Sequence, residues 1–103
     1  MAILYVSEYT APAFFNAEPL QMGSEPPNAE QTIAISGTST QLTNPLQANT
    51  NFIRVHNDSS GPCCVAFGSS PTATTQNKRL APNQTEYFAV TPRSQVAVVS
   101  VAL

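Results

Sequence analysis

The chain has 103 residues, which suffices for one domain of ordinary size and excludes a second. Charged residues make up 10% of it, against roughly 25% in most soluble domains, and the formal net charge of -2 at pH 7 argues against nucleic acid as a partner. The sequence has neither a basic segment followed by an apolar stretch nor an apolar run long enough for a membrane span. We therefore expect a soluble protein made in the cytoplasm.

The low charge indicates a subunit that is packed against neighbours. A free monomer usually keeps charges on its exterior for solubility, whereas a contact surface avoids the cost of desolvating them. The charges that exist are separated along the chain. The acidic residues of the first half all precede Arg54, the first basic residue: Glu8, Glu18, Glu25 and Glu30. This separation suits head-to-tail contacts between copies or an acidic arm on a basic neighbour.

Residues 2–7 have the β-branched and aromatic side chains typical of a strand. From residue 10 to residue 29 four prolines interrupt any ladder or helix, so we expect an extended arm without secondary structure. The arm carries large apolar side chains that a disordered linker lacks: Phe14, Phe15, Leu20 and Met22. We expect it to dock on its own domain or on a neighbouring subunit.

Strand-like segments resume after the arm and are separated by turns: 31–36, a short strand within 37–51, 52–57, 63–68, 78–81, 85–90 and 95–103. The turn sequence NDSSGP lies between the 52–57 and 63–68 segments, so these two strands are expected to form a hairpin. The 95–103 segment is apolar on both faces, which is typical of a strand that is central in a sheet or covered by a partner.

These elements predict the fold class. No long window keeps apolar residues at helical spacing without a proline or glycine. Many short strands with frequent turn signals indicate an all-β fold, a small β-sandwich or barrel of jelly-roll or immunoglobulin-like type with an extended Pro-rich N-terminal arm. We divide the chain into an N-terminal strand and arm, residues 1–30, and a β-domain, residues 31–103.

The two cysteines, Cys63 and Cys64, are adjacent in the 63–68 strand and are therefore expected on opposite faces of the sheet. Diverging side chains cannot close an unstrained disulfide. They also fit no zinc site with His56 and Asp58, because zinc ligands are spaced so that they converge on one point. We expect two free thiols, no bound metal and no cofactor.

His56 is the only histidine and the only candidate for a catalytic base. It lies in the 52–57 strand, where alternation places Ile53 and Val55 inward and Arg54 and His56 outward. Neither a G-x-S-x-G elbow nor a Cys-His signature accompanies it. We therefore predict that the protein is not an enzyme.

Aromatic residues raise the alternative of a sugar-stacking platform: Tyr5, Tyr9, Phe14, Phe15, Phe52, Phe67, Tyr87 and Phe88. Most of them are better explained as core residues. The absence of tryptophan also makes carbohydrate binding less favoured.

Two parts of the chain resemble small structural proteins of tailed bacteriophages. The first is the start, MAILYVSEY, followed by a Pro-rich segment. The second is the run from residue 52 to residue 90, with VAFG, PTAT, RLAP and EYF followed by Val90 in that order. The resemblance implies a virion component, a capsid decoration or cement protein on the head surface. Such proteins are small β-domains, often dimers or trimers, that clamp neighbouring major capsid subunits and carry no catalytic residues.

On this interpretation the partners are the major capsid protein or another virion protein, and further copies of the chain, with neither nucleic acid nor membrane involved. The expected contact residues combine the apolar arm, the flanking Tyr9 and the basic side chains: Tyr9, Phe14, Phe15, Leu20, Met22, Arg54, Lys78, Arg79 and Arg93. The alternatives are a neck, tail or fibre-base subunit and, less favoured, a glycan-binding module.

Overall fold

The computed structural model describes residues 2–15, 18–23 and 25–101, and this part of the chain consists of strands and connections without a helix. The all-β prediction is confirmed. The strands are β1 (Ile3–Tyr9), β2 (Pro12–Phe15), β3 (Glu18–Gly23), β4 (Ala29–Ala34), β5 (Thr40–Gln41), β6 (Phe52–Asp58), β7 (Cys63–Gly68), β8 (Lys78–Leu80), β9 (Thr85–Ala89) and β10 (Gln95–Ser100).

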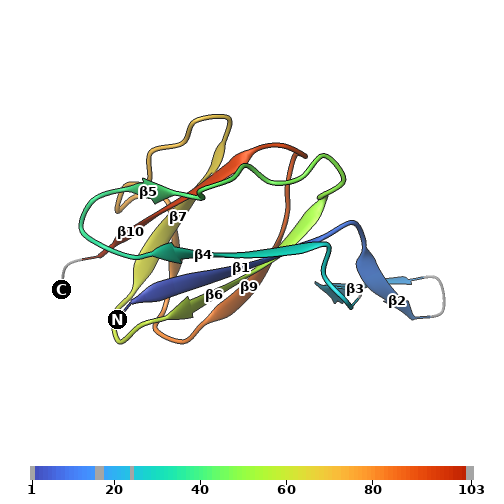
Figure 1. Cartoon of the computed structure of the whole chain (residues 1–103). Helices are drawn as coiled ribbons and strands as arrows, with labels where there is room; N and C mark the ends of the chain where they lie inside the picture. Colours follow the sequence, from blue (N-terminus) through green and yellow to red (C-terminus); the bar gives the residue numbers. More distant parts are fainter. Residues whose placement is uncertain (1, 16–17, 24, 102–103) are drawn as a thin grey trace.

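Eight of these strands form two antiparallel sheets (Figure 1). The first sheet has the order β4-β1-β6-β9, and the second has the order β5-β10-β7-β8. The other two strands, β2 and β3, pair with each other in a hairpin that stands beyond one end of the sheets (Figure 1). β1, from the expected 1–30 segment, lies between β4 and β6 and is therefore internal to the first sheet.

One apolar core lies between the two sheets, which makes the arrangement sandwich-like. Alternate residues of the first sheet point into it, with Leu4 and Val6 from β1 and Ile53 and Val55 from β6. The second sheet supplies the opposing side chains: Cys63, Val65, Leu80, Val96 and Val98. All of these are at most 1% exposed. The prediction that Ile53 and Val55 face inward is confirmed.

A second, smaller apolar cluster lies on the outer face of the second sheet. The β7–β8 connection places Ala73 over Cys64, Ala97 and Val99. Its backbone is held there because the Ala73 N–H donates to Ser39 Oγ at 2.8 Å. The outer face of β10 is thus covered by the chain's own β7–β8 connection, which explains why this strand is apolar on both faces. As predicted, the adjacent cysteines lie on opposite faces, and both thiols are free and buried.

The predicted hairpin of 52–57 with 63–68 is wrong. β6 pairs with β1 and β9 in the first sheet, whereas β7 pairs with β10 and β8 in the second. The turn between them crosses from one sheet to the other, and the buried Asn57 side chain stabilises it there. Asn57 Nδ2 lies 3.0 Å from the Gly61 carbonyl oxygen and 3.3 and 3.1 Å from those of Leu80 and Ala81.

The arm was expected to lack secondary structure. It instead contains β2 and β3, which pair as an antiparallel hairpin. Prolines are tolerated there for a physical reason. Each strand of a two-stranded ribbon has one unpaired edge, and Pro12 also opens β2, so neither proline has to interrupt a continuous ladder. The side chains of the arm from residue 12 to residue 24 lie outside the described part, including four expected contact residues: Phe14, Phe15, Leu20 and Met22.

The two long sides of the sandwich differ. On one side the chain passes directly from β4 to β5, and the Ile35 N–H donates to the Ala2 carbonyl at 3.0 Å. On the other side β8 and β9 are the edge strands of their sheets, joined by a turn in which Asn83 adopts a positive φ of 61°. Asparagine tolerates this left-handed conformation better than most residues.

Candidate functional site

The outer face of the first sheet carries a row of aromatic rings across β1, β6 and β9. The strand register places Tyr9 opposite Phe52 and Arg54 opposite Tyr87. The ring centroids of Tyr9 and Phe52 are 6.4 Å apart, and those of Phe52 and Tyr87 are 5.3 Å apart with their planes 20° from parallel. The row points away from the core because alternate residues such as Ile53 point into it.

We call this surface the tyrosine face and define it by six side chains: Tyr5, Tyr9, Phe52, Arg54, His56 and Tyr87. Tyr5 is 42% exposed and lies opposite His56 in the register of β1 with β6. The imidazole of His56 is oriented by a hydrogen bond of 2.8 Å between Nδ1 and Thr85 Oγ1. The tyrosine face therefore combines ring surface with hydroxyl, imidazole and guanidinium groups, a mixture common in protein contact surfaces.

Tyr9 connects the tyrosine face with the arm. Its hydroxyl donates a hydrogen bond of 2.5 Å to Glu25 Oε2, although only 3% of the residue is exposed. Burial, reinforced by the neighbouring Glu25, raises the pKa of Tyr9 to about 12. At neutral pH Tyr9 is therefore a protonated donor that holds the end of the arm against β1.

We expect the free energy of unfolding to fall as the pH rises above about 9. Burial raises the pKa of Cys63 to about 11 from an ordinary value of 9.0, and that of Tyr9 to about 12 from 10.0. Both groups keep their protons to higher pH in the folded state than in the unfolded state. Their contribution to stability is therefore complete below the unfolded pKa values and is lost as the pH passes through the folded ones.

Urea denaturation at several pH values from about 7 to 11 measures this loss, because the range begins well below the ordinary thiol pKa of 9.0 and ends at the raised pKa of Cys63. Cys63→Val is the matched variant, because it should fold and lose less stability between pH 9 and pH 11. An unfolding free energy that stays flat over this range would contradict the assignment of both groups.

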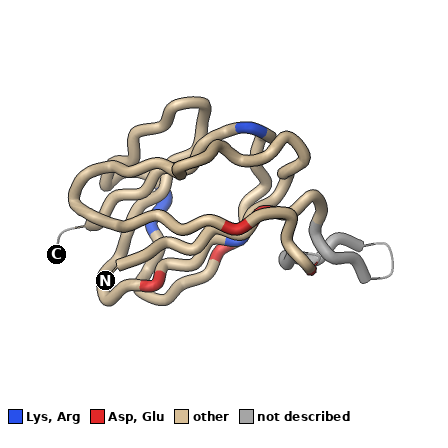
Figure 2. Tube along the Cα trace, in the orientation of Figure 1, with Lys and Arg blue, Asp and Glu red and all other residues tan. Residues whose placement is uncertain are grey.

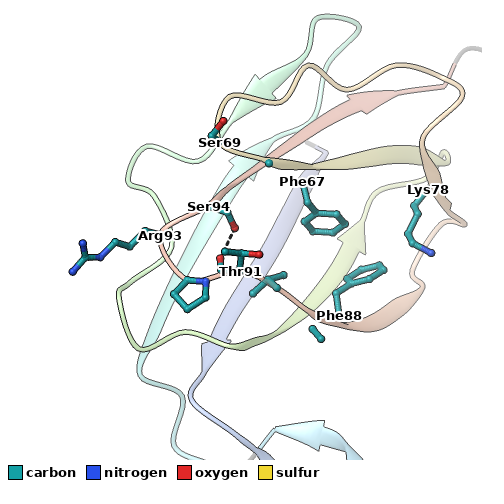
Figure 3. Close-up of a pocket in the computed structure, with 11 residues that line it drawn as sticks. Phe67, Ser69, Lys78, Phe88, Thr91, Arg93 and Ser94 are labelled. Carbon is teal, nitrogen blue, oxygen red and sulfur yellow. Dashed lines mark hydrogen bonds between the residues drawn. The ribbon is translucent and has the colours of Figure 1, made fainter.

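The open side of the sandwich, between β8 and β9, contains a cavity of about 490 Å³, which we call the edge groove. Its lining comes from β7, β8, β9 and the β9–β10 connection: Phe67, Gly68, Ser69, Lys78, Phe88, Ala89, Val90, Thr91, Pro92, Arg93 and Ser94. Figure 3 shows Phe67 and Phe88 side by side, and their ring centroids are 4.9 Å apart. Lys78 Nζ lies 5.7 Å from the centroid of Phe88, within cation–π range.

A second cavity of about 360 Å³ shares Lys78 and Phe88 with the edge groove and extends it along β8 and β9. Arg79 and Glu86 line this extension. The Glu86 carboxyl group accepts a hydrogen bond of 2.8 Å from Gln84 Nε2. Arg93 lies at the other end of the groove, and its side chain points away from the cavity (Figure 3). The mouth of the groove is therefore predominantly basic.

The structure divides the contact residues expected from the sequence into two groups. Tyr9 and Arg54 belong to the tyrosine face, whereas Lys78, Arg79 and Arg93 surround the edge groove on the open side. The four apolar residues of the arm remain predictions, because their side chains lie outside the described part: Phe14, Phe15, Leu20 and Met22.

The sequence interpretation missed the aromatic residues of both surfaces, because it assigned most aromatic side chains to the core. Tyr5, Phe52 and Tyr87 point outward instead, and Phe67 and Phe88 are only partly buried at the groove. The alternation of the 52–57 strand contained a usable signal. If Ile53 points inward, its neighbour Phe52 must point outward.

Across the residues that the structure describes, no three His, Cys, Asp or Glu side chains come together as a metal site requires. The same residues form no helix of the length and apolar character needed to cross a bilayer.

Comparison with known proteins gives no match to this chain among family descriptions, curated proteins or solved structures.

Proposed function

We propose that the chain is a virion structural protein that binds other proteins without catalysis, most specifically a capsid decoration or cement protein of a tailed bacteriophage. The observation that carries the binding role is the tyrosine face. Its rings lie on the side of a sheet whose other side already fills the core. Tyr5 is exposed and Phe52 and Tyr87 are half-buried, so these three rings are available to a partner, whereas Tyr9 is buried beneath the end of the arm. Tyrosine and arginine are enriched among the few residues that contribute most of the binding free energy at protein interfaces.

The phage assignment rests on the sequence resemblance, and the strand order supports a fold that suits it. The strands can be renumbered from 1 to 7 along β4 to β10, with β1 taken as strand 8. The sheet β4-β1-β6-β9 then has the order 1-8-3-6, and the sheet β5-β10-β7-β8 has the order 2-7-4-5. This is the order of a jelly roll in which β1 takes the place of the eighth strand. We propose a jelly-roll fold on this basis, an architecture found in capsid and lectin domains.

Two backbone hydrogen bonds support this placement of β1. The Ile35 N–H donates to the Ala2 carbonyl at 3.0 Å, and the Ser100 N–H donates to the Ser36 carbonyl at 2.8 Å. The start of β1 and the end of β10 are therefore bridged by two consecutive residues. A strand that followed β10 in a conventional jelly roll would begin close to the place where β1 begins.

A protein partner fits the tyrosine face better than a glycan does. Sugar rings bind by stacking on a free aromatic face. In the row of the tyrosine face Phe52 and Tyr87 stack on each other, and Tyr9 packs against Phe52. The faces of these rings are thus largely occupied by neighbouring rings, and the exposed edges of Phe52 and Tyr87 and the Tyr87 hydroxyl group remain for a partner surface.

Cosedimentation with expanded phage heads that lack this protein tests the proposal. We expect saturable binding at a fixed ratio to the major capsid protein. The double variant Tyr5→Ser with Arg54→Glu should bind at least about tenfold more weakly, because it removes an exposed ring and reverses a charge on the tyrosine face. Thr75→Glu, on the exposed β7–β8 connection, is the control that should bind like the original chain.

The other outcomes are equally informative. Binding to purified necks or tails instead of heads would contradict the decoration role and favour the neck, tail or fibre-base alternative. Binding to heads that is unchanged in the double variant would remove the tyrosine face from the contact. Binding that free oligosaccharides abolish would contradict the protein partner.

A further inference from the structure

We propose that the edge groove binds the arm of a second copy of the chain, so that copies associate through an arm on one molecule and a groove on the next. This inference concerns self-association and does not depend on the proposed function, which assigns the tyrosine face to a different protein. The shape and charge of the groove are complementary to the composition of the arm.

The groove has the size and lining of a binding cleft. Its volume of about 490 Å³ lies within the range of roughly 300–1,000 Å³ typical of ligand sites. The rings of Phe67 and Phe88 form its apolar centre, and both are only partly buried by the protein itself. An apolar side chain placed against them would remove ring surface from water, which is the main source of binding free energy.

The edge strands make the groove suitable for an extended segment. β8 and β9 each have a partner strand on one side only, so their other sides present unpaired N–H and C=O groups beside the cavity. An incoming extended segment can pair with such an edge and direct alternate side chains into the cavity. Lys78 and Arg79 on β8 are exposed and also discourage nonspecific pairing along this edge. That role alone does not account for the cavity beside them.

The charge of the groove selects an acidic occupant. Three of the four basic residues of the chain lie at the groove and its extension: Lys78 and Arg79 line them, and Arg93 lies at the rim with its side chain directed outward. Glu86 is the acidic residue among the lining side chains. Lys78 Nζ lies 5.7 Å from the centroid of the Phe88 ring. An occupant that covers this ring must also accommodate the ammonium group, which favours a carboxylate beside an apolar side chain.

The arm has this composition. Residues 10–29 contain Glu18 and Glu25 and no basic residue, together with adjacent phenylalanines at positions 14 and 15. The hairpin within the arm stands beyond the end of the sheets rather than on them (Figure 1). In Figure 2, which colours acidic and basic residues along the trace, the described basic positions lie on the sandwich. Acidic arm and basic groove are therefore complementary between copies.

A charge exchange between two variants tests this pairing. Lys78→Glu with Arg93→Glu reverses the groove, and Glu18→Lys with Gln21→Lys reverses the arm while keeping Glu25, which binds Tyr9. The original chain should sediment as a dimer or larger oligomer. Each double variant alone should associate about 100-fold more weakly, and a 1:1 mixture should associate again, because each acidic segment then meets a basic one.

The control is Arg54→Glu, which reverses the one basic side chain outside the groove and should leave self-association unchanged. Circular dichroism establishes that every variant is folded. A chain that stays monomeric at a protein concentration of about 100 μM would overturn the proposal. So would oligomers that persist in the groove variant, or a mixture that fails to associate.

The experiment also separates this inference from the proposed function. Loss of head binding in the Tyr5 and Arg54 variant with intact self-association would support the tyrosine face alone. Loss of self-association in the groove variant with head binding retained by single subunits would support the edge groove alone.

Discussion

Replacement of Glu8 by alanine is expected to lower the free energy of unfolding by about 2 to 4 kcal/mol, because three donors lose a buried acceptor. Glu8 is 0% exposed and continues the inward series of β1 after Leu4 and Val6. Its Oε1 accepts hydrogen bonds from Thr50 Oγ1 at 2.7 Å and from the backbone N–H of Gln47 at 2.9 Å. Its Oε2 accepts one from Gln31 Nε2 at 3.1 Å.

These bonds explain how an irregular segment is held against the sheet. The segment from residue 43 to residue 51 has no strand pairing, and Glu8 ties two of its residues, Gln47 and Thr50, to β1. Without the carboxyl group their donors would remain buried and unpaired, and the segment would have to move outward to reach water. The loss therefore includes local packing as well as hydrogen bonds.

Urea denaturation at neutral pH measures the effect, with two further variants for comparison. Glu8→Gln should lower the free energy of unfolding by less than Glu8→Ala does. It keeps one acceptor oxygen but turns an amide donor towards the amide donor of Gln31. Glu30→Ala removes an exposed acidic residue on neighbouring β4 and should change stability by no more than about 0.5 kcal/mol. Equal losses for Glu8→Ala and Glu30→Ala would contradict the role of the buried network.

Much of the fold follows from the sequence, because β-structure has a simple period. Alternation in 52–57 identified Ile53 and Val55 as core residues, and the adjacent cysteines were correctly placed on opposite faces. Strand pairing was harder to predict. The turn after Asp58 crosses between the sheets instead of closing a hairpin, and the side chain that stabilises it, Asn57, has Leu80 and Ala81, far along the chain, among its partners.

The candidate sites were only partly predictable for the same reason. A sequence shows that Lys78 and Arg93 are basic, but their position around one groove arises from the pairing of β7 with β8 and the packing of the two sheets. The aromatic row of Tyr9, Phe52 and Tyr87 likewise depends on the register of three strands. Both surfaces are products of contacts between segments that are distant in sequence, and local patterns do not encode such contacts.

Replacement of Asn57 by aspartate is expected to cost about 3 to 5 kcal/mol of unfolding free energy, more than replacement by alanine. Asn57 is 0% exposed, and its Nδ2 faces the carbonyl oxygens of Gly61, Leu80 and Ala81 at 3.0 to 3.3 Å. Aspartate would place an acceptor where these three acceptors converge. Alanine would remove the donor without adding repulsion, and we expect a loss of about 2 kcal/mol.

The neighbouring residue offers a matched control for this change. Asp58→Asn makes the reverse exchange one position along β6, where the side chain is exposed, and should alter stability by no more than about 0.5 kcal/mol. The order of stability should therefore be Asp58→Asn above Asn57→Ala above Asn57→Asp. Because Asn57 joins the β6–β7 turn to the β8–β9 turn, Asn57→Asp should also speed hydrogen exchange at both turns. An exchange pattern changed at only one of them would show that the side chain does not link the two sheets.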